Sequence, residues 1–156
     1  MWSSEVLCHA GDKAELLAAV GRCLKPGGIF LFSDIMGADA ADEAQLRAFT
    51  DRNATTALGR PSEYTALLGA AGMRYMSWWD NSHHLERYFR AMLAQIDSHS
   101  TEMLKAGLTE QYLNNWRSSL RERAETQAKH GVFAWGVFLA RKPLLSEGNL
   151  AANGHA

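Results

Sequence analysis

The sequence predicts an α/β fold in which helices pack against a largely parallel sheet. The run Ile29-Phe30-Leu31-Phe32 is apolar without alternation, which is typical of a strand buried on both faces. The segment before it carries apolar residues at helical spacing and ends at Pro26-Gly27-Gly28, a sequence that stops a helix and turns the chain. A helix, a short turn and a buried strand in this order indicate a βαβ-type arrangement.

Helices and strands alternate along the rest of the chain. Asp12 has Glu15 three residues later, which predicts the N-cap of the first helix, and Ser62 is predicted to cap a later one. Residues 1–11 are expected to form the end of a strand and a loop. The order predicted after the first helix is a strand at 29–33, helices at 40–57 and from 62 to about 69, a strand at 73–79, helices at 83–105 and 109–128, and a strand at 132–139.

Residues 1–142 are predicted to form one domain, and residues 143–156 a disordered tail rich in Gly, Asn and Ala. The strand at 29–33 has no complete parallel partner before it. A sheet of so few strands with this many helices leaves one edge and part of one face uncovered. We therefore expect the C-terminal part of a larger doubly wound domain, whose exposed sheet edge offers a route to oligomers.

Composition excludes several classes of function. The 156 residues suit one domain, and a net charge of −1 gives no basic excess for nucleic acid or an acidic membrane surface. No apolar run is long enough to span a bilayer, and the N-terminal residues do not resemble a secretory signal. Cys8 and Cys23 are expected to be reduced thiols of a cytoplasmic protein, with Cys23 in the core. Adjacent His83 and His84 diverge on a helix, so no metal site is predicted.

Several blocks of the sequence together resemble the class I S-adenosylmethionine-dependent methyltransferases. The similarity is greatest to the N-methyltransferases of glycine, sarcosine and dimethylglycine and to the phosphoethanolamine methyltransferases. The blocks are Trp2-Ser3 with His9 and Gly11-Asp12, then Leu24-Lys25-Pro26-Gly27-Gly28, then Ser33-Asp34-Ile35-Met36, and finally Phe133-Ala134-Trp135-Gly136-Val137-Phe138.

The resemblance implies a Rossmann-like, seven-stranded sheet flanked by helices, of which this chain lacks the first strands. In that family a G-x-G-x-G loop and an acidic residue hold the cofactor S-adenosylmethionine, and this sequence has neither. We expect methyl transfer to a small amine in the parent enzyme and no activity from this chain alone. The alternatives are a fragment of an O-methyltransferase of natural-product metabolism and a non-catalytic half-domain that pairs with another chain.

The resemblance also implies site residues before the Pro-Gly-Gly turn. His9 is expected to be the catalytic residue, which orients a partner group or relays the proton of the amine. Glu5 is expected to pair with the substrate ammonium, and Trp2 and Ser3 to line the rim of the cofactor site. The alternative interpretations are a histidine bonded to backbone, a solvated carboxylate and a tryptophan that serves only packing.

Further substrate-binding residues are expected after the turn. Asp34 and Met36 lie at the carboxyl end of a strand, where open α/β sheets bind ligands, although Asp34 as the cap of a turn is an alternative. The resemblance adds Tyr64, Tyr88 and Arg90. Arg90 is expected to hold an acid group of the substrate. Tyr88 lies on the apolar stripe of its helix, so packing in the core is its alternative role.

Overall fold

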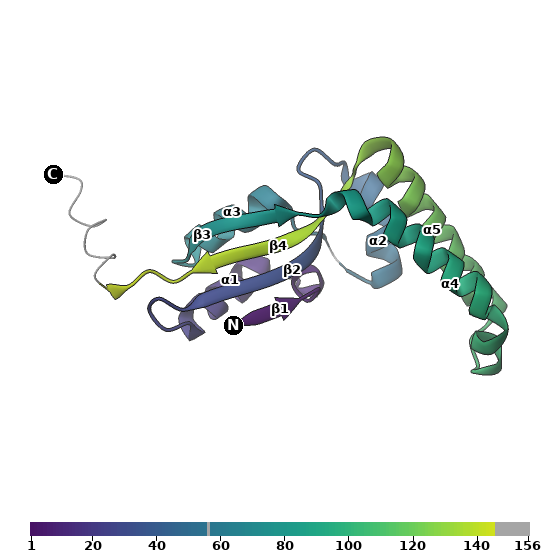
Figure 1. Ribbon diagram of the computed structural model, residues 1–156, viewed down its shortest axis with the longest axis horizontal. Helices are drawn as coiled ribbons and strands as arrows, with labels where there is room; N and C mark the ends of the chain where they lie inside the picture. The colour runs from purple at the N-terminus through teal and green to yellow at the C-terminus, as the bar shows by residue number, and fades with distance from the viewer. Residues whose placement is uncertain (56, 146–156) are drawn as a thin grey trace.

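The structure is a computed structural model that describes residues 1–55 and 57–145, and it has an open four-stranded sheet with helices packed on one face and at one end (Figure 1). The predicted order of helices and strands is confirmed, with element ends displaced by a few residues. The elements are β1 (Trp2–Ser4), the 3₁₀ helix η1 (Leu7–His9), α1 (Lys13–Cys23), β2 (Ile29–Gly37), α2 (Glu43–Asn53), α3 (Pro61–Ala70), β3 (Arg74–Asp80), the 3₁₀ helix η2 (Ser82–His84), α4 (Leu85–Lys105), α5 (Glu110–His130) and β4 (Phe133–Arg141).

The strands lie in the order β1-β2-β4-β3, and the sheet is mixed. β1 runs parallel to β2, with Trp2 opposite Leu31. β4 inserts between β2 and β3 and is antiparallel to both. The prediction of a largely parallel sheet is therefore wrong for two of the three strand pairs. The relative direction of two strands depends on pairing between distant segments, which local apolar patterns do not encode.

One face of the sheet carries the first of two hydrophobic cores. Phe30 and Phe32 of β2 and Phe138 of β4 point toward α1 and α3, which lie behind the sheet in Figure 1. The rings of Phe32 and Phe138 stack with centroids 4.9 Å apart. Gly136 lets β3 approach closely, because a Cβ atom at this position would lie 2.3 Å from the carbonyl oxygen of Trp79.

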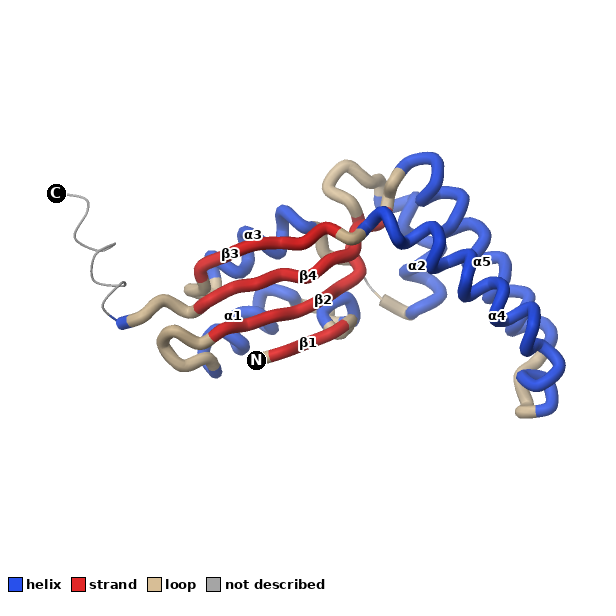
Figure 2. Tube along the Cα trace, viewed as in Figure 1, coloured by secondary structure: helices blue, strands red, loops and turns tan. Residues whose placement is uncertain are grey.

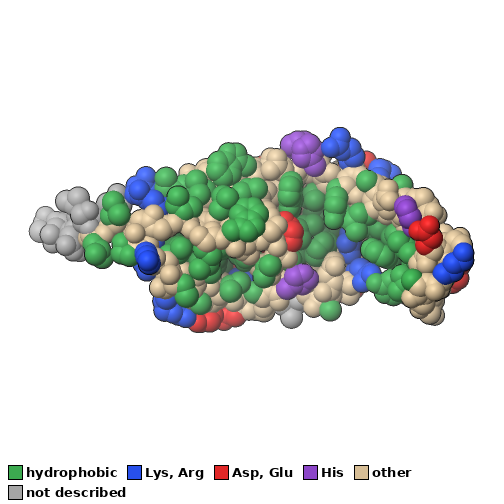
Figure 3. Space-filling view, turned by 60° about the horizontal axis from the view of Figure 1, so that its bottom comes forward, with side chains coloured by type: hydrophobic (Ala, Val, Ile, Leu, Met, Phe, Trp, Pro, Cys, Tyr) green, Lys and Arg blue, Asp and Glu red, His purple; other side chains and the backbone are tan. Residues whose placement is uncertain are grey.

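None of the described helices lies over the opposite face of the sheet (Figure 1). Trp2, Ile29 and Trp79 are 60%, 52% and 51% exposed there. Hydrophobic side chains gather over this part of the molecule (Figure 3). The prediction that the strand beginning at Ile29 is buried on both faces is wrong for its first residue, because helices cover only one side of β2 at that end.

The second core joins the sheet to a helical hairpin. α4 and α5 project together beyond the ends of the strands, and α2 lies beside them (Figure 2). Phe49 of α2 and Phe89 of α4 pack on Phe133, the first residue of β4, with ring centroids 6.0 and 5.6 Å from its own. Gly131, at φ +59°, ends α5 in the left-handed conformation and directs the chain into β4.

Local details confirm one predicted cap and correct two other predictions. The carboxylate of Asp12 accepts from the backbone N–H of Glu15, so the predicted cap of α1 is confirmed. Ser62 does not cap α3, because Pro61 already occupies the first helical position and Arg60 precedes it as the N-cap. Cys23 is exposed rather than part of the core. The buried side of α1 carries Lys13, Leu17 and Gly21, and Cys23 lies outside this row.

The predicted tail lies largely outside the described residues, which end at residue 145. Among the residues that the structure describes, no helix combines the length and apolarity needed to cross a membrane.

Candidate active site

A cavity of about 770 Å³ lies where the carboxyl ends of β1 and β2 meet the helical hairpin. Figure 3 shows a recess with a largely hydrophobic lining at this junction. The end of a parallel strand pair is where α/β sheets bind ligands, and the volume suits a small molecule. The lining residues are Ser4, Glu5, Cys8, His9, Ser33, Ile35, Phe49, Asn53, His84, Leu85, Arg87, Tyr88, Phe89, Ala91, Met92, Arg123 and Trp135.

On the sheet side, Glu5 is held in a defined position. It follows β1 at φ +53°, a backbone conformation that residues other than glycine rarely adopt. Its backbone N–H donates to the Ser33 carbonyl oxygen at 2.9 Å. Its Oε1 accepts from the Ser33 hydroxyl at 2.8 Å and from the Trp135 indole N–H at 2.9 Å. These bonds hold a carboxylate at the wall of the cavity.

Asp34 lies beneath this wall and has no exposed surface. Its carboxylate accepts from the backbone N–H of Cys8 at 3.1 Å and from the Tyr64 hydroxyl at 2.6 Å. Burial raises the pKa of Asp34 to about 6, against the opposing effect of these two hydrogen bonds. Burial and the neighbouring Asp34 raise the pKa of Tyr64 far above its usual range. Asp34 and Tyr64 therefore hold η1 in place and do not line the cavity.

η1 presents Cys8 and His9 to the cavity in different ways. Cys8 is buried, and burial together with Asp34 raises the pKa of its thiol to about 12. A thiol with this pKa stays protonated at neutral pH and is a poor nucleophile. His9 is exposed on the wall of the cavity, where it can accept or donate a proton.

On the hairpin side, the cavity contains a buried cation. Arg123 of α5 is 4% exposed, and its Nε and Nη2 donate to the Ala48 carbonyl oxygen at 3.1 and 2.9 Å. Its guanidinium lies over the Phe49 ring, 4.6 Å from the centroid. Burial lowers the pKa of Arg123 to about 10, so the side chain remains charged at neutral pH.

The residues predicted to form the site fall into three places. Glu5, His9 and Tyr88 line the cavity. Asp34, Tyr64 and Met36 are fully buried outside its lining. Trp2 and Ser3 lie on the edge strand β1, next to the lining residue Ser4, and Arg90 forms an exposed ion pair with Glu86 at 2.9 Å. Binding and catalytic roles for all of them stay predictions.

Sequence reasoning missed Arg123 and Trp135. Arg123 lies on the same helical stripe as Leu113, Leu120 and Ala124, which are all buried. An arginine in phase with a core stripe is a pattern that indicates a buried cation, and arginine is rarely buried without a partner.

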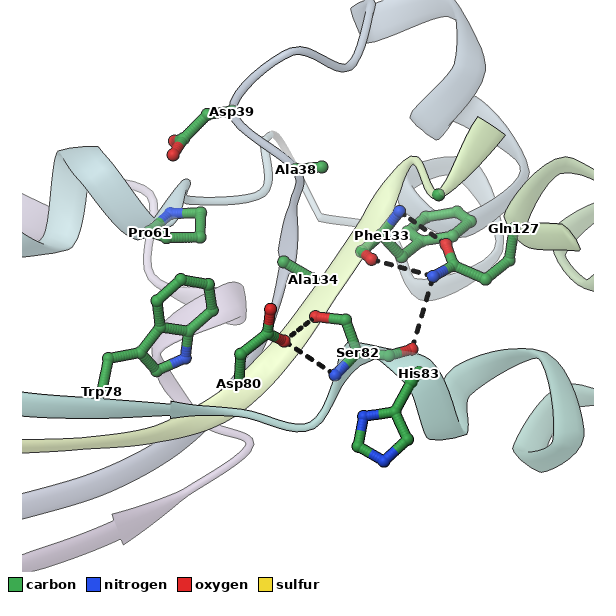
Figure 4. A pocket seen from close by; sticks show the side chains of 11 residues that line it. Ala38, Asp39, Pro61, Trp78, Asp80, Ser82, His83, Gln127, Phe133 and Ala134 are labelled. Atoms are coloured by element: carbon green, nitrogen blue, oxygen red, sulfur yellow. Dashed lines mark hydrogen bonds between the residues drawn. The ribbon is translucent and has the colours of Figure 1, made fainter. Parts of the chain in front are cut away.

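A smaller cavity of about 240 Å³ lies near the start of β4, between Trp78 and η2 (Figure 4). Most of its polar side chains form hydrogen bonds with neighbouring residues of the protein. Asp80 accepts from the backbone N–H and hydroxyl of Ser82, and Gln127 exchanges hydrogen bonds with the backbone of Phe133 at 2.8 and 3.1 Å. These bonds fasten η2 and α5 to β4. Within residues 1–55 and 57–145, no cluster of His, Cys, Asp or Glu suits a metal ion.

The fold is that of S-adenosylmethionine-dependent methyltransferases, and the resemblance expected from the sequence is confirmed. A search of protein families finds no matching family. The chain is 32% identical to dimethylglycine N-methyltransferase of Parasynechococcus marenigrum over 92% of its own length and 50% of that protein. It thus spans about half the length of this curated relative.

Two solved structures show the same fold. A putative sarcosine dimethylglycine methyltransferase from Galdieria sulphuraria matches with a TM-score of 0.79 at 23% identity, over 91% of this chain and 52% of that one. Phosphoethanolamine N-methyltransferase 2 of Haemonchus contortus, in complex with phosphomonomethylethanolamine and S-adenosylhomocysteine, matches with a TM-score of 0.74 at 15% identity, over 91% and 32%.

Proposed function

We propose that this chain forms the acceptor-binding half of an S-adenosylmethionine-dependent N-methyltransferase acting on a small amine such as glycine, sarcosine or dimethylglycine. The observation that carries the proposal is the cavity at the carboxyl ends of β1 and β2, where Glu5 and His9 face aromatic side chains of the hairpin. The 32% identity to a dimethylglycine N-methyltransferase supports the choice of acceptor.

The cavity offers what methyl transfer to an amine requires. The nucleophile must be oriented and its nitrogen deprotonated at the moment of attack. The carboxylate of Glu5 can hold the ammonium form, and the rings of Tyr88 and Trp135 can contact its methyl groups. His9 can take up the proton that leaves before the nitrogen attacks.

The residues of this chain do not fit the whole cofactor. S-adenosylmethionine supplies an electrophilic methyl group on a sulfonium. The sequence has no G-x-G-x-G loop to receive it, and Trp2 and Ser3 on β1 would form only a rim. We therefore expect weak or no binding in isothermal titration of this chain with S-adenosylmethionine. Micromolar affinity would overturn the proposed division of the site.

A chimera tests the acceptor. The segment of the Parasynechococcus enzyme that this chain matches is replaced by residues 1–145, and methylation of glycine, sarcosine, dimethylglycine and a panel of hydroxyl acceptors is measured. We expect methylation of at least one of the amines, and loss of most of that activity in Glu5→Ala. Glu15→Ala, which removes only the exposed ion pair with Arg22, is the matched control. Methylation of hydroxyl acceptors alone would replace the proposal with the O-methyltransferase alternative.

The open edge of β1 favours a second candidate, a half-domain that completes its sheet with another chain. The exposed Trp2, Ile29 and Trp79 lie on the uncovered face beside that edge. Size-exclusion chromatography with light scattering tests it, because a clean monomer across concentrations counts against association. We also propose a cytoplasmic location, which the unpaired Cys8 and Cys23 support.

A further inference from the structure

We propose that Arg123 binds the carboxylate of a zwitterionic acceptor in this cavity and thereby selects amino acids over amines that lack an acid group. The inference rests on the proposed function, which it deepens by assigning a specificity residue. It moves that role from Arg90, which lies on the exposed side of α4 and pairs with Glu86.

The first argument is that Arg123 is a buried charge without a carboxylate partner. It is 4% exposed, and the ion pairs of the described residues do not include it. Burying a cation without a counter-ion is costly, so an anion bound in the cavity would stabilise this charge. Ala48 accepts from Nε and Nη2, and hydrogen bonds among the described residues leave Nη1 available to a ligand.

The second argument is that the guanidinium is held rigidly before any ligand arrives. The Phe49 ring lies 4.6 Å away and the Phe89 ring 6.0 Å away. The Ala48 carbonyl oxygen also accepts from the Ser119 hydroxyl at 2.6 Å, which fixes α2 against α5 at this point. A preorganised donor loses little conformational freedom on binding, and an apolar setting strengthens its charge-assisted hydrogen bonds.

The third argument is the distribution of charge around the cavity. The sheet side carries a carboxylate, Glu5, and the hairpin side carries Arg123. A molecule with an ammonium group and a carboxylate therefore meets an opposite charge at each wall. Arg87 also lines the cavity but is exposed, so Arg123 is the buried arginine among the lining residues. A single guanidinium neutralises the one charge of a carboxylate but only part of the charge of a phosphate monoester, which is about −1.5 to −2 at pH 7.

Titration followed by ¹⁵N NMR tests the proposal on the chain itself. The indole N–H of Trp135 reports on the cavity, because it lines the wall and donates to Glu5. Dimethylglycine is titrated against dimethylglycinamide, which keeps the amine and loses the carboxylate. We expect saturable shifts with dimethylglycine and at least tenfold weaker binding of the amide. Equal affinities, or no shift with dimethylglycine at millimolar concentrations, would overturn the proposal.

Variants locate the effect at one side chain. Arg123→Met should weaken dimethylglycine binding about 10- to 100-fold, the range expected for hydrogen bonds to a charged group. Arg123→Lys keeps the charge without the planar guanidinium, so its affinity should lie between those of the parent protein and Arg123→Met. The matched control Arg121→Met, at an exposed arginine of the same helix outside the cavity lining, should bind like the parent protein. Equal affinity of Arg123→Met and Arg121→Met refutes the assignment. If Arg123→Met fails to fold by circular dichroism, the comparison of Arg123→Lys with the amide result decides.

Phosphoethanolamine is the third ligand in the titration. If it binds more tightly than dimethylglycine, the anion is a phosphate and the assignment to a carboxylate fails. Because none of these measurements involves methyl transfer, they separate the two proposals. An active chimera with unaltered acceptor affinity in Arg123→Met would refute the role of Arg123 alone.

Discussion

The buried carboxyl of Asp34 should control how the stability of this protein depends on pH. Burial raises its pKa from 3.8 to about 6. Between these values the folded state holds a proton that the unfolded state releases, so the free energy of unfolding falls as pH rises through the window. A shift of about two units at 1.36 kcal/mol per unit amounts to about 3 kcal/mol. Asp34 has no exposed surface, so solvent does not weaken this contribution to the free energy of unfolding.

Asp34→Asn removes this titration while its amide oxygen can still accept from the backbone N–H of Cys8. Urea unfolding by circular dichroism at a series of pH values gives the free energy of unfolding for both proteins. We expect the difference between the variant and the parent to change by about 3 kcal/mol between pH 3 and 7, in favour of the variant at the higher pH. The exposed Asp51→Asn is the control. Parallel curves for parent and Asp34→Asn would refute the account.

Three further substitutions test the packing and the helix ends. Gly136→Ala should destabilise the protein by at least 1–3 kcal/mol in urea unfolding, because the new Cβ atom would lie 2.3 Å from a backbone oxygen of β3; unchanged stability would contradict this close approach. Ala54→Gly should raise the free energy of unfolding by about 0.5–1 kcal/mol, since residue 54 closes α2 at φ +51°, and a lower midpoint would count against it. Thr109→Ala should cost about 1 kcal/mol through loss of the α5 cap, while Thr109→Ser should not.

Much of the fold could be predicted because its elements have strong local patterns. The apolar spacing and the Asp12 cap placed α1. The helix predicted at 109–128 begins where α5 does, at its N-cap Thr109, and ends two residues before α5 does. Strand direction could not be predicted in this way. The placement of β4 between β2 and β3 depends on contacts between distant segments, and nothing in the composition of β4 distinguishes a parallel from an antiparallel neighbour.

The candidate site was predicted only in part, for a similar reason. A helix turns by about 100° per residue, so the phase of α4 relative to the sheet decides which residues face the cavity. Tyr88 faces the cavity and Arg90 does not. The predicted strand end at residue 33 is wrong, because β2 continues to Gly37; Asp34 lies within the strand, and its carboxylate points inward to Tyr64. The phase of a helix and the choice between inward and outward rotamers both depend on the packed neighbours.

The position of β4 also governs the order in which the chain can fold. Ile29 pairs with Arg141, and β3 joins the sheet only through β4. During synthesis β2 is complete about a hundred residues before its antiparallel neighbour, so the sheet cannot assemble until the last of these strands has left the ribosome. Until then, among the described strands, β2 can pair only with the three-residue β1, and the backbone groups on its β4 side stay unpaired.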